Sequence, residues 1–177
     1  MNKGNGRINN FKNIGQDNGF NIKRTNVKNI KESEVENLVE KEREEHIIRG
    51  SFKHDVKYIS GGHGEENIEY MKENGIPYEI NIEYNNGVRV GNILDSTQSK
   101  FKSGNKHSWF PKEWTREKII RATNVVASKF EGIPKPRDSI IGIYEGIRMT
   151  VIFGENGKVS TSFPNKEQDG GIKYENR

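Results

Sequence analysis

Histidine is the residue type in this chain best suited to acid–base chemistry near neutral pH, because its ordinary pKa is about 6.5. The chain has four: His46, His54, His63 and His107. Glycines flank His63 on both sides, so its imidazole is uncrowded and the nearby backbone can approach a ligand or offer N–H groups to a phosphate. If the fold brings His46 and His63 together, one can act as a general base and the other as a general acid. Such a pair can cleave RNA through its own 2′-OH, since one imidazole takes the hydroxyl proton and the other protonates the leaving 5′-oxygen.

Each histidine also has a simpler interpretation. His46 follows an apolar stripe and could pack in the core, His63 could be an ordinary loop residue, and His54 is expected to be exposed. A metal site is a further alternative, because these three histidines fall within 18 residues. Their spacings lack the helical i, i+4 pair of zinc proteases, and the chain has no cysteine for a structural zinc site, a disulfide or a thiol nucleophile. We therefore expect no metal site and no cofactor; the sequence leaves open whether Mn²⁺ stimulates activity.

A basic and aromatic segment runs from Lys100 to Arg121. It has seven Lys or Arg against two Glu, a balance of +5, with aromatic rings interleaved. Single-stranded RNA is bound by cations that contact phosphates and by rings that stack on bases. We expect substrate contacts from Lys102, Lys106, His107 and Lys112. Phe110 and Trp114 are expected to pack in the core instead.

The segment Thr161-Ser162-Phe163-Pro164 ends the last predicted strand. A strand end can present a hydroxyl group and an aromatic ring to a nucleobase, and Thr161 and Phe163 project from the same side because they are two residues apart. We expect Ser162 and Phe163 to bind substrate as well. Ordinary burial in a sheet is the alternative.

The elements that must position these residues point to an α+β domain, with N-terminal helices followed by antiparallel β-sheets. An amphipathic helix is predicted over 31–45 and a second from Thr115 to about Phe130. A hairpin is predicted over 78–94, followed by a three-stranded antiparallel meander at 140–144, 147–153 and 158–163.

The rest of the chain is polar. Residues 1–30 contain nine Asn and have a charge balance of +5, which predicts a flexible basic arm or linker. The folded domain is expected over 31–166, and 167–177 is expected to be a polar tail that frays. The net charge of +4 suits a polyanionic partner only weakly. With 31% hydrophobic residues and no long apolar run, the chain is expected to be soluble.

Four blocks together resemble the bacterial EndoU endoribonuclease family in order and spacing, over about residues 40–166. They are Glu45-His46-Ile-Ile-Arg-Gly50, Gly61-Gly62-His63, Trp109-Phe110-Pro111 followed by Trp114, and Thr161-Ser162-Phe163-Pro164. The resemblance implies the fold shared by EndoU, barnase and RelE-like toxins. It also implies cleavage of RNA at uridines to leave a 2′,3′-cyclic phosphate, with His46 as proton donor and His63 as base. The catalytic lysine of eukaryotic and viral relatives cannot be placed here by motif, and the bacterial branch points to Thr161 instead. Phe163 stands where some relatives have Tyr, which loses a phenol hydrogen bond and keeps a stacking ring.

The resemblance further implies a toxin. Bacterial EndoU domains are usually the C-terminal parts of large secreted toxins used in contact-dependent growth inhibition, each neutralised by a cognate immunity protein. By this analogy the chain is secreted within a larger toxin, acts in the target-cell cytoplasm and cuts RNA, with tRNA as the expected target. Two other hypotheses remain open: a non-catalytic RNA-binding module, and a toxin that acts by protein interaction without needing His63.

Overall fold

The computed structural model describes residues 31, 34–55, 57–94, 101 and 103–176. The described residues form three α-helices, namely α1 (Lys41–Ile48), α2 (Glu65–Glu73) and α3 (Arg116–Ser128). Their strands are β1 (Ser51–Lys53), β2 (Lys57–Ser60), β3 (Tyr78–Tyr84), β4 (Arg89–Ile93), β5 (His107–Trp109), β6 (Ser139–Tyr144), β7 (Ile147–Phe153), β8 (Val159–Pro164) and β9 (Ile172–Glu175), with a 3₁₀ turn η2 (Glu155–Gly157) between β7 and β8. The predicted α+β class is confirmed.

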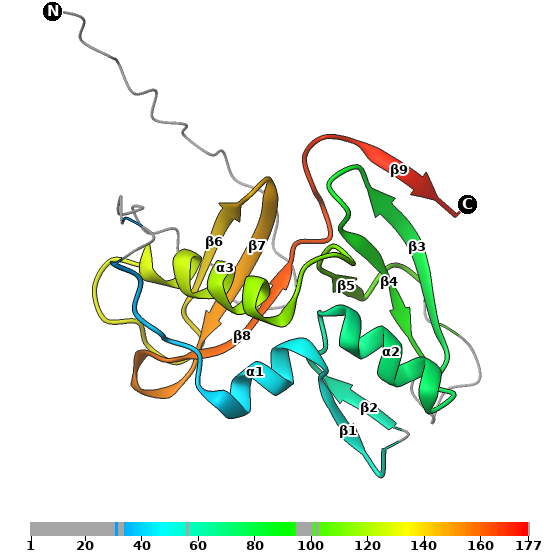
Figure 1. The fold of residues 1–177 in the computed structure, drawn as a ribbon, viewed down its shortest axis with the longest axis horizontal. Coiled ribbons are helices and arrows are strands. Elements are labelled where there is room, and N and C mark those ends of the chain that lie inside the picture. The colour runs from blue at the N-terminus through cyan, green and yellow to red at the C-terminus, as the bar shows by residue number, and fades with distance from the viewer. Residues whose placement is uncertain (1–30, 32–33, 56, 95–100, 102, 177) are drawn as a thin grey trace, which may run out of the picture.

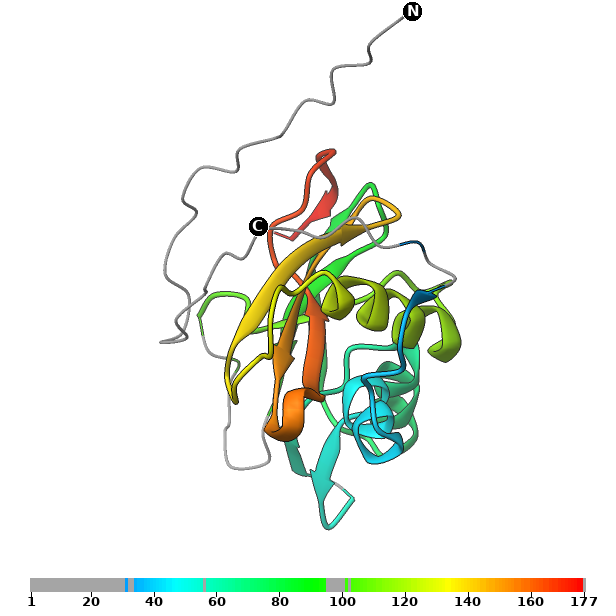
Figure 2. The same cartoon turned by 90° about the vertical axis from the view of Figure 1, so that its left-hand side faces the viewer.

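Two antiparallel sheets lie side by side, with the helices on one side of them (Figure 1). One has the strand order β5-β4-β3-β9 and the other β6-β7-β8, while β1 and β2 form a separate hairpin that projects from the body. The Oγ of Ser108 on β5 donates to the carbonyl oxygen of Pro164 on β8 at 2.6 Å, which joins the two sheets. Figure 2, turned by 90°, shows α3 lying along the β6-β7-β8 sheet.

The larger core lies between α3 and the β6-β7-β8 sheet. Thr115 begins α3 as predicted, because its hydroxyl accepts from the Lys118 backbone N–H. The helix then places a nearly continuous apolar face on the sheet, and Gly142 lets Val126 approach so closely that a Cβ at 142 would lie 2.8 Å from a Val126 methyl carbon. The predicted meander and the 78–94 hairpin are confirmed, as is the burial of Phe110 and Trp114.

A smaller core forms where α2 covers the β3–β5 sheet. Ile68 and Met71 of α2 pack with Trp109 of β5, and all three are buried. The Trp109 indole N–H donates to the Asn67 side-chain oxygen at 2.9 Å. This core therefore ties the strand that carries His107 to the helix that follows His63.

Two segments differ from the sequence-based expectation. The Val35–Val39 stripe is not helical, because the backbone of Leu38 is already used: its N–H donates to the Asn124 side chain and its carbonyl accepts from Val159. The expected fraying of 167–177 is also wrong, since β9 pairs with β3. The basic arm predicted at 1–30 lies outside the described residues. No helix in the described part of the chain combines the length and apolar character needed to cross a bilayer.

Candidate active site

The turn before α2 lies against the last turn of α1, and this contact brings two histidines together. The backbone N–H groups of Gly62, His63 and Gly64 donate in succession to the carbonyl oxygens of residues 46, 47 and 48, at 2.9, 2.7 and 3.0 Å. These bonds satisfy carbonyl groups that a helix end leaves unpaired. Gly61 and Gly62 both have a φ of 75°, in the left-handed region. A Cβ at Gly61 would lie 2.2 Å from the His46 carbonyl oxygen, so only glycine fits.

His63 is buried and its tautomer is fixed by one contact. Its Nδ1 lies 2.7 Å from the Ser108 carbonyl oxygen, and because a carbonyl only accepts, Nδ1 carries the proton. The neutral ring then has its lone pair on Nε2. Burial lowers the pKa of His63 to about 4, an effect that the Ser108 hydrogen bond opposes and the charge of His46 reinforces. His63 is therefore neutral at pH 7 and can accept a proton at Nε2.

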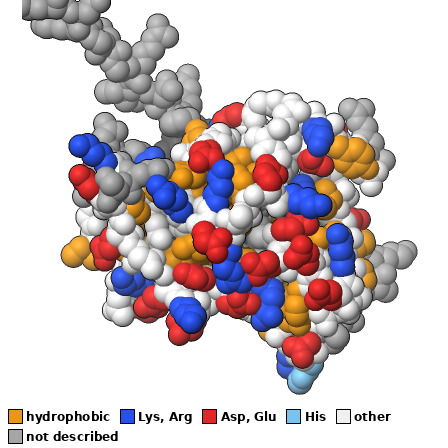
Figure 3. All heavy atoms as spheres, in the orientation of Figure 1, with side chains coloured by type: hydrophobic (Ala, Val, Ile, Leu, Met, Phe, Trp, Pro, Cys, Tyr) orange, Lys and Arg blue, Asp and Glu red, His pale blue; other side chains and the backbone are white. Residues whose placement is uncertain are grey.

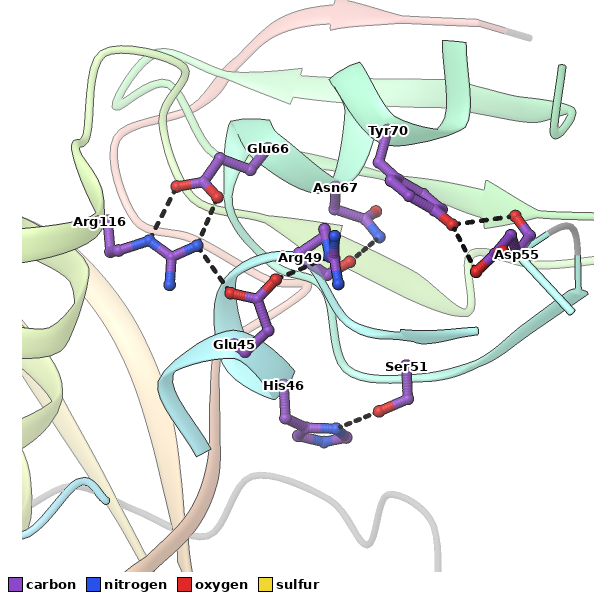
Figure 4. A network of polar contacts seen from close by, with 9 residues as sticks. All are labelled: Glu45, His46, Arg49, Ser51, Asp55, Glu66, Asn67, Tyr70 and Arg116. Carbon is purple, nitrogen blue, oxygen red and sulfur yellow. Dashed lines mark hydrogen bonds and ion pairs between the residues drawn. The ribbon is translucent and has the colours of Figure 1, made fainter. Parts of the chain in front are cut away.

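His46 occupies the last turn of α1 and is only partly buried. Its Nδ1 lies 3.0 Å from the Ser51 hydroxyl oxygen (Figure 4), and its Nε2 would be 2.9 Å from a Cβ at Gly61. Partial burial, with a smaller contribution from Arg43, lowers the pKa of His46. Of the two imidazoles, His46 is the less enclosed.

His107 lies beneath His63, which corrects the prediction that it contacts RNA. The two imidazole rings are stacked, with centroids 4.6 Å apart and planes 6° from parallel. Trp109 lies 4.5 Å away, centroid to centroid, and only 6% of His107 is exposed. The interleaving of rings and lysines along the sequence suggested an exposed surface, but all three residues of β5, the edge strand that Ser108 links to β8, are buried.

Thr161, Ser162 and Phe163 are consecutive on β8, so the side chains of Thr161 and Phe163 lie on one face of the strand and that of Ser162 on the other. On the neighbouring strand β7, Ile152 pairs with Thr161 and Thr150 pairs with Phe163. The Phe163 ring centroid lies 5.5 Å from that of His63. The Thr161 hydroxyl oxygen is buried and makes no hydrogen bond among the described residues. Ser162 points to the opposite face.

Ser162 therefore does not reach the histidines. It is fully buried, and its hydroxyl shares a 2.7 Å hydrogen bond with the Thr123 hydroxyl of α3. The prediction that Ser162 binds substrate fails because alternation along a strand directs every second side chain into the core.

The predicted lysine contacts do not form one surface. Lys106 is exposed one residue before His107, whereas Lys102 lies outside the described residues. Lys112 lines a cavity of about 380 Å³ together with five carboxylates: Glu65, Glu66, Glu69, Glu113 and Glu117. Figure 3 shows acidic and basic side chains intermixed across this face of the molecule. Lys112 is poorly placed to bind a polyanion, because the nearby carboxylates repel phosphates.

An ion-pair network holds the two helices around the site. Arg116 contacts Glu66 of α2 through two nitrogens and Glu45 of α1 through one, and Glu45 also pairs with Arg49 (Figure 4). The buried Asn67 amide adds a 2.7 Å hydrogen bond to the Arg49 carbonyl oxygen. Sequence reasoning missed the contacts of Arg116 and Asn67, since interactions between distant segments carry no local pattern; only the Glu45–Arg49 pair has the local i, i+4 spacing.

Sequence reasoning also missed two direct partners of the histidines, the Ser108 carbonyl and the Tyr58 hydroxyl. The first is a backbone atom, so residue type gives no signal for it.

Among the residues that the structure describes, no three His, Asp or Glu side chains are grouped to hold a metal ion.

Comparison with known protein families identifies this chain's relatives. The family model described as bacterial EndoU nuclease matches residues 40–166. No curated protein and no solved structure matched the chain.

Proposed function

The chain belongs to the bacterial EndoU nuclease family and is therefore an RNA-cleaving endonuclease, and we propose that it cuts at uridines by attack of the RNA 2′-OH, with His46, His63 and Thr161 at its centre. The observation that carries this proposal is the hydrogen bond from His63 Nδ1 to the Ser108 carbonyl. It leaves Nε2 as the one basic nitrogen of that ring.

In the proposed reaction, His63 Nε2 takes the proton of the 2′-OH. The 2′-oxygen attacks the adjacent phosphorus, and the bond from phosphorus to the 5′-oxygen breaks. His46 gives its proton to that leaving oxygen, so the products are a 2′,3′-cyclic phosphate and a 5′-hydroxyl. The roles follow from burial: the more enclosed His63 holds a proton poorly and suits the base, whereas the less enclosed His46 suits the acid.

Thr161 and Phe163 bind the substrate in this proposal. The Thr161 hydroxyl has no partner among the described residues, and a buried unpaired hydroxyl costs about 1–3 kcal/mol unless a ligand satisfies it. The Phe163 ring lies beside His63, where it can stack on the base next to the scissile phosphate. Lys106 is exposed one residue before His107 and is proposed to contact a phosphate.

The biological setting is proposed from the family alone. The chain acts as the toxin part of a larger secreted protein, in the cytoplasm of a target cell, on RNA that includes tRNA, and a cognate immunity protein blocks it. The two histidines supply both proton transfers, so the proposed reaction needs no cofactor.

A defined RNA tests the mechanism. A short oligonucleotide with a single uridine should be cut in EDTA, and mass spectrometry should find a cyclic phosphate at the new 3′ end. The same oligonucleotide with 2′-deoxyuridine at that position should stay intact. His46→Ala and His63→Ala should each lower kcat by about 10²–10⁴, whereas His54→Asn, at the exposed hairpin tip, should not. Binding without cleavage would contradict the proposal and support the RNA-binding module.

A further inference from the structure

The strongest unexplained feature near the site is a third buried histidine, which bonds to the turn that carries His63 and lies beside Tyr58. His107 Nε2 lies 2.7 Å from the Gly62 carbonyl oxygen, so Nε2 carries a proton. Its Nδ1 lies 3.3 Å from the Tyr58 hydroxyl oxygen, and that hydroxyl donates its single proton to the Gly61 carbonyl at 3.0 Å. The carbonyl groups that precede His63 are thus held by one imidazole and one phenol.

We infer that His107 is a positioning residue: it clamps the Gly61–His63 turn through the Gly62 carbonyl and supports the His63 ring from one face, so that His63 Nε2 stays directed at the substrate. This inference rests on the proposed role of His63 as the base. His107 does not itself touch RNA, because it is almost fully buried between His63 and Trp109.

The clamp is needed because the turn is made of the residues with the greatest backbone freedom. Gly61 and Gly62 are both left-handed, and no side chain of their own restricts them. The N–H groups of the turn are fixed by α1, while its two carbonyls are fixed by His107 and Tyr58. Without the second set of bonds, the peptide groups before His63 could rotate and take the imidazole with them.

The stack also affects the charge of His63. A second neutral ring excludes water from one face of His63, and loss of hydration disfavours the imidazolium. The charged or titratable groups that bear on this pair are His46 from α1, Tyr58 from β2 and Lys166 after β8. Burial and the charges of His63 and Lys166 lower the pKa of His107 well below its ordinary range, so His107 is neutral and adds no positive charge beneath His63.

Two substitutions separate the two parts of this role. His107→Gln keeps an N–H donor for the Gly62 carbonyl and removes the ring; His107→Phe keeps a ring under His63 and removes the donor. His54→Asn is the matched control, because it also replaces a histidine, lies at an exposed position and suits its φ of 52°.

The first measurement uses the free protein without RNA, so it does not depend on the proposed reaction. Imidazole NMR spectra recorded across pH report the pKa and tautomer of His63. In His107→Gln the pKa of His63 should rise from about 4 toward its ordinary value, since water gains access to its ring. In His107→Phe the pKa should change less, while the Nδ1–H tautomer becomes mixed as the turn loosens.

The second measurement is cleavage of the single-uridine RNA. Each His107 variant should lose about 10- to 100-fold in kcat, the cost of a small misplacement of a reacting group, with KM unchanged. Wild-type kcat and an unaltered His63 titration would overturn the inference, as would a change confined to KM, which would indicate direct RNA contact. If His63→Ala stays active, the proposed base is wrong, whereas the NMR result still decides whether His107 positions His63.

Tyr58→Phe is a less disruptive test of the clamp, for use if the His107 variants do not fold. It removes one hydroxyl and keeps the ring, so the Gly61 carbonyl loses its donor and His107 Nδ1 loses its neighbour, while the Gly62 carbonyl keeps its bond to His107. A lower kcat at unchanged KM and melting temperature supports the clamp. Unchanged kcat in a folded Tyr58→Phe, together with unfolding of both His107 variants, would show that His107 serves stability only and overturn the inference.

Discussion

The carbonyl oxygen of Ser108 lies 2.7 Å from Nδ1 of His63. Because the acceptor belongs to the backbone, no substitution at position 108 short of moving β5 can remove it. The side chain of the same residue bonds to Pro164 on β8. Ser108 of β5 thus fixes the tautomer of the proposed base through its backbone, and through its side chain it joins the sheet of β5 to the β6-β7-β8 sheet.

The pH dependence of cleavage should be bell-shaped and centred on the acid side of neutrality. His63 must be neutral to act as a base and has a pKa of about 4, so kcat/KM should rise through that pH. His46 must carry a proton to act as an acid, and its pKa lies below the ordinary 6.5, so kcat/KM should fall before pH 7. Steady-state rates from pH 3.5 to 8 measure this. Rates that keep rising above pH 6.5 would contradict the assigned roles.

Folding stability should decline as pH falls from 6.5 toward 4. In that window the unfolded chain binds protons at its histidines, while the buried His63 and His107 remain neutral in the folded state. Stability is therefore fully present above pH 6.5, and His63 alone accounts for a loss of about 3 kcal/mol on reaching pH 4. Urea unfolding at several pH values tests this. The decline should be smaller in His63→Ala than in the His54→Asn control.

Thr161→Val should separate stability from activity. The change removes a buried hydroxyl that has no partner among the described residues, so the melting temperature should stay the same or rise. Turnover should fall if the hydroxyl binds substrate. Thr161→Ser is the control, since it keeps the hydroxyl and should retain activity. A drop in melting temperature at full activity would place the hydroxyl outside the site.

Phe163 should govern the choice of base. Its ring is only partly buried and lies next to His63, so Phe163→Ala should weaken RNA binding by about 1–3 kcal/mol through lost stacking. Phe163→Tyr keeps the ring and adds a hydroxyl, and should raise uridine selectivity at unchanged melting temperature. Competition between oligonucleotides that differ in one base measures the selectivity. Lower melting with unaltered selectivity would instead make Phe163 a core residue.

Lys106 and Lys112 should differ in their effect on RNA binding. Lys106 is exposed beside His107, so Lys106→Ala should reduce the slope of log affinity against log salt by about 0.7, the value for one lost phosphate contact on a single strand. Lys112 sits among glutamates, so Lys112→Ala should leave the slope unchanged. Salt titrations of binding in the His63→Ala background, in which cleavage is expected to be slow, provide the comparison. An unchanged slope in Lys106→Ala would show that the strand passes elsewhere.

Local signals in the sequence predicted the elements with strong periodicity. The alternation over Tyr78–Tyr84, the cap at Thr115 and the three late strands are all present. The short β5 and the charged α2 were not predicted, because three residues give no period and α2 contributes only a narrow apolar face to the smaller core. The 35–39 stripe has helical spacing, yet long-range backbone bonds keep it extended.

The candidate site shows the same division. His46, His63 and Phe163 could be named from the sequence, because each lies in a distinctive block, and the structure brings them to one place. The burial of His107 and Ser162 could not be read from spacing, because it depends on which face of a strand the neighbouring helix covers. The supports at Ser108, Tyr58 and Asn67 join residues that lie 45, 49 and 42 positions from their partners, beyond any local pattern.

The three backbone bonds between residues 46–48 and 62–64 have a consequence for the hairpin formed by β1 and β2. They hold together the two ends of the segment that contains β1 and β2, so the hairpin leaves the body of the protein and returns to it beside α1 (Figure 1). Lengthening a closed loop costs little, about 0.6 kcal/mol for each doubling. The tip at His54 and Asp55 can therefore accept an inserted peptide while the separation of the His46 and His63 imidazoles stays set by their own backbone. The hairpin is thus a suitable attachment point for a reporter or an affinity tag.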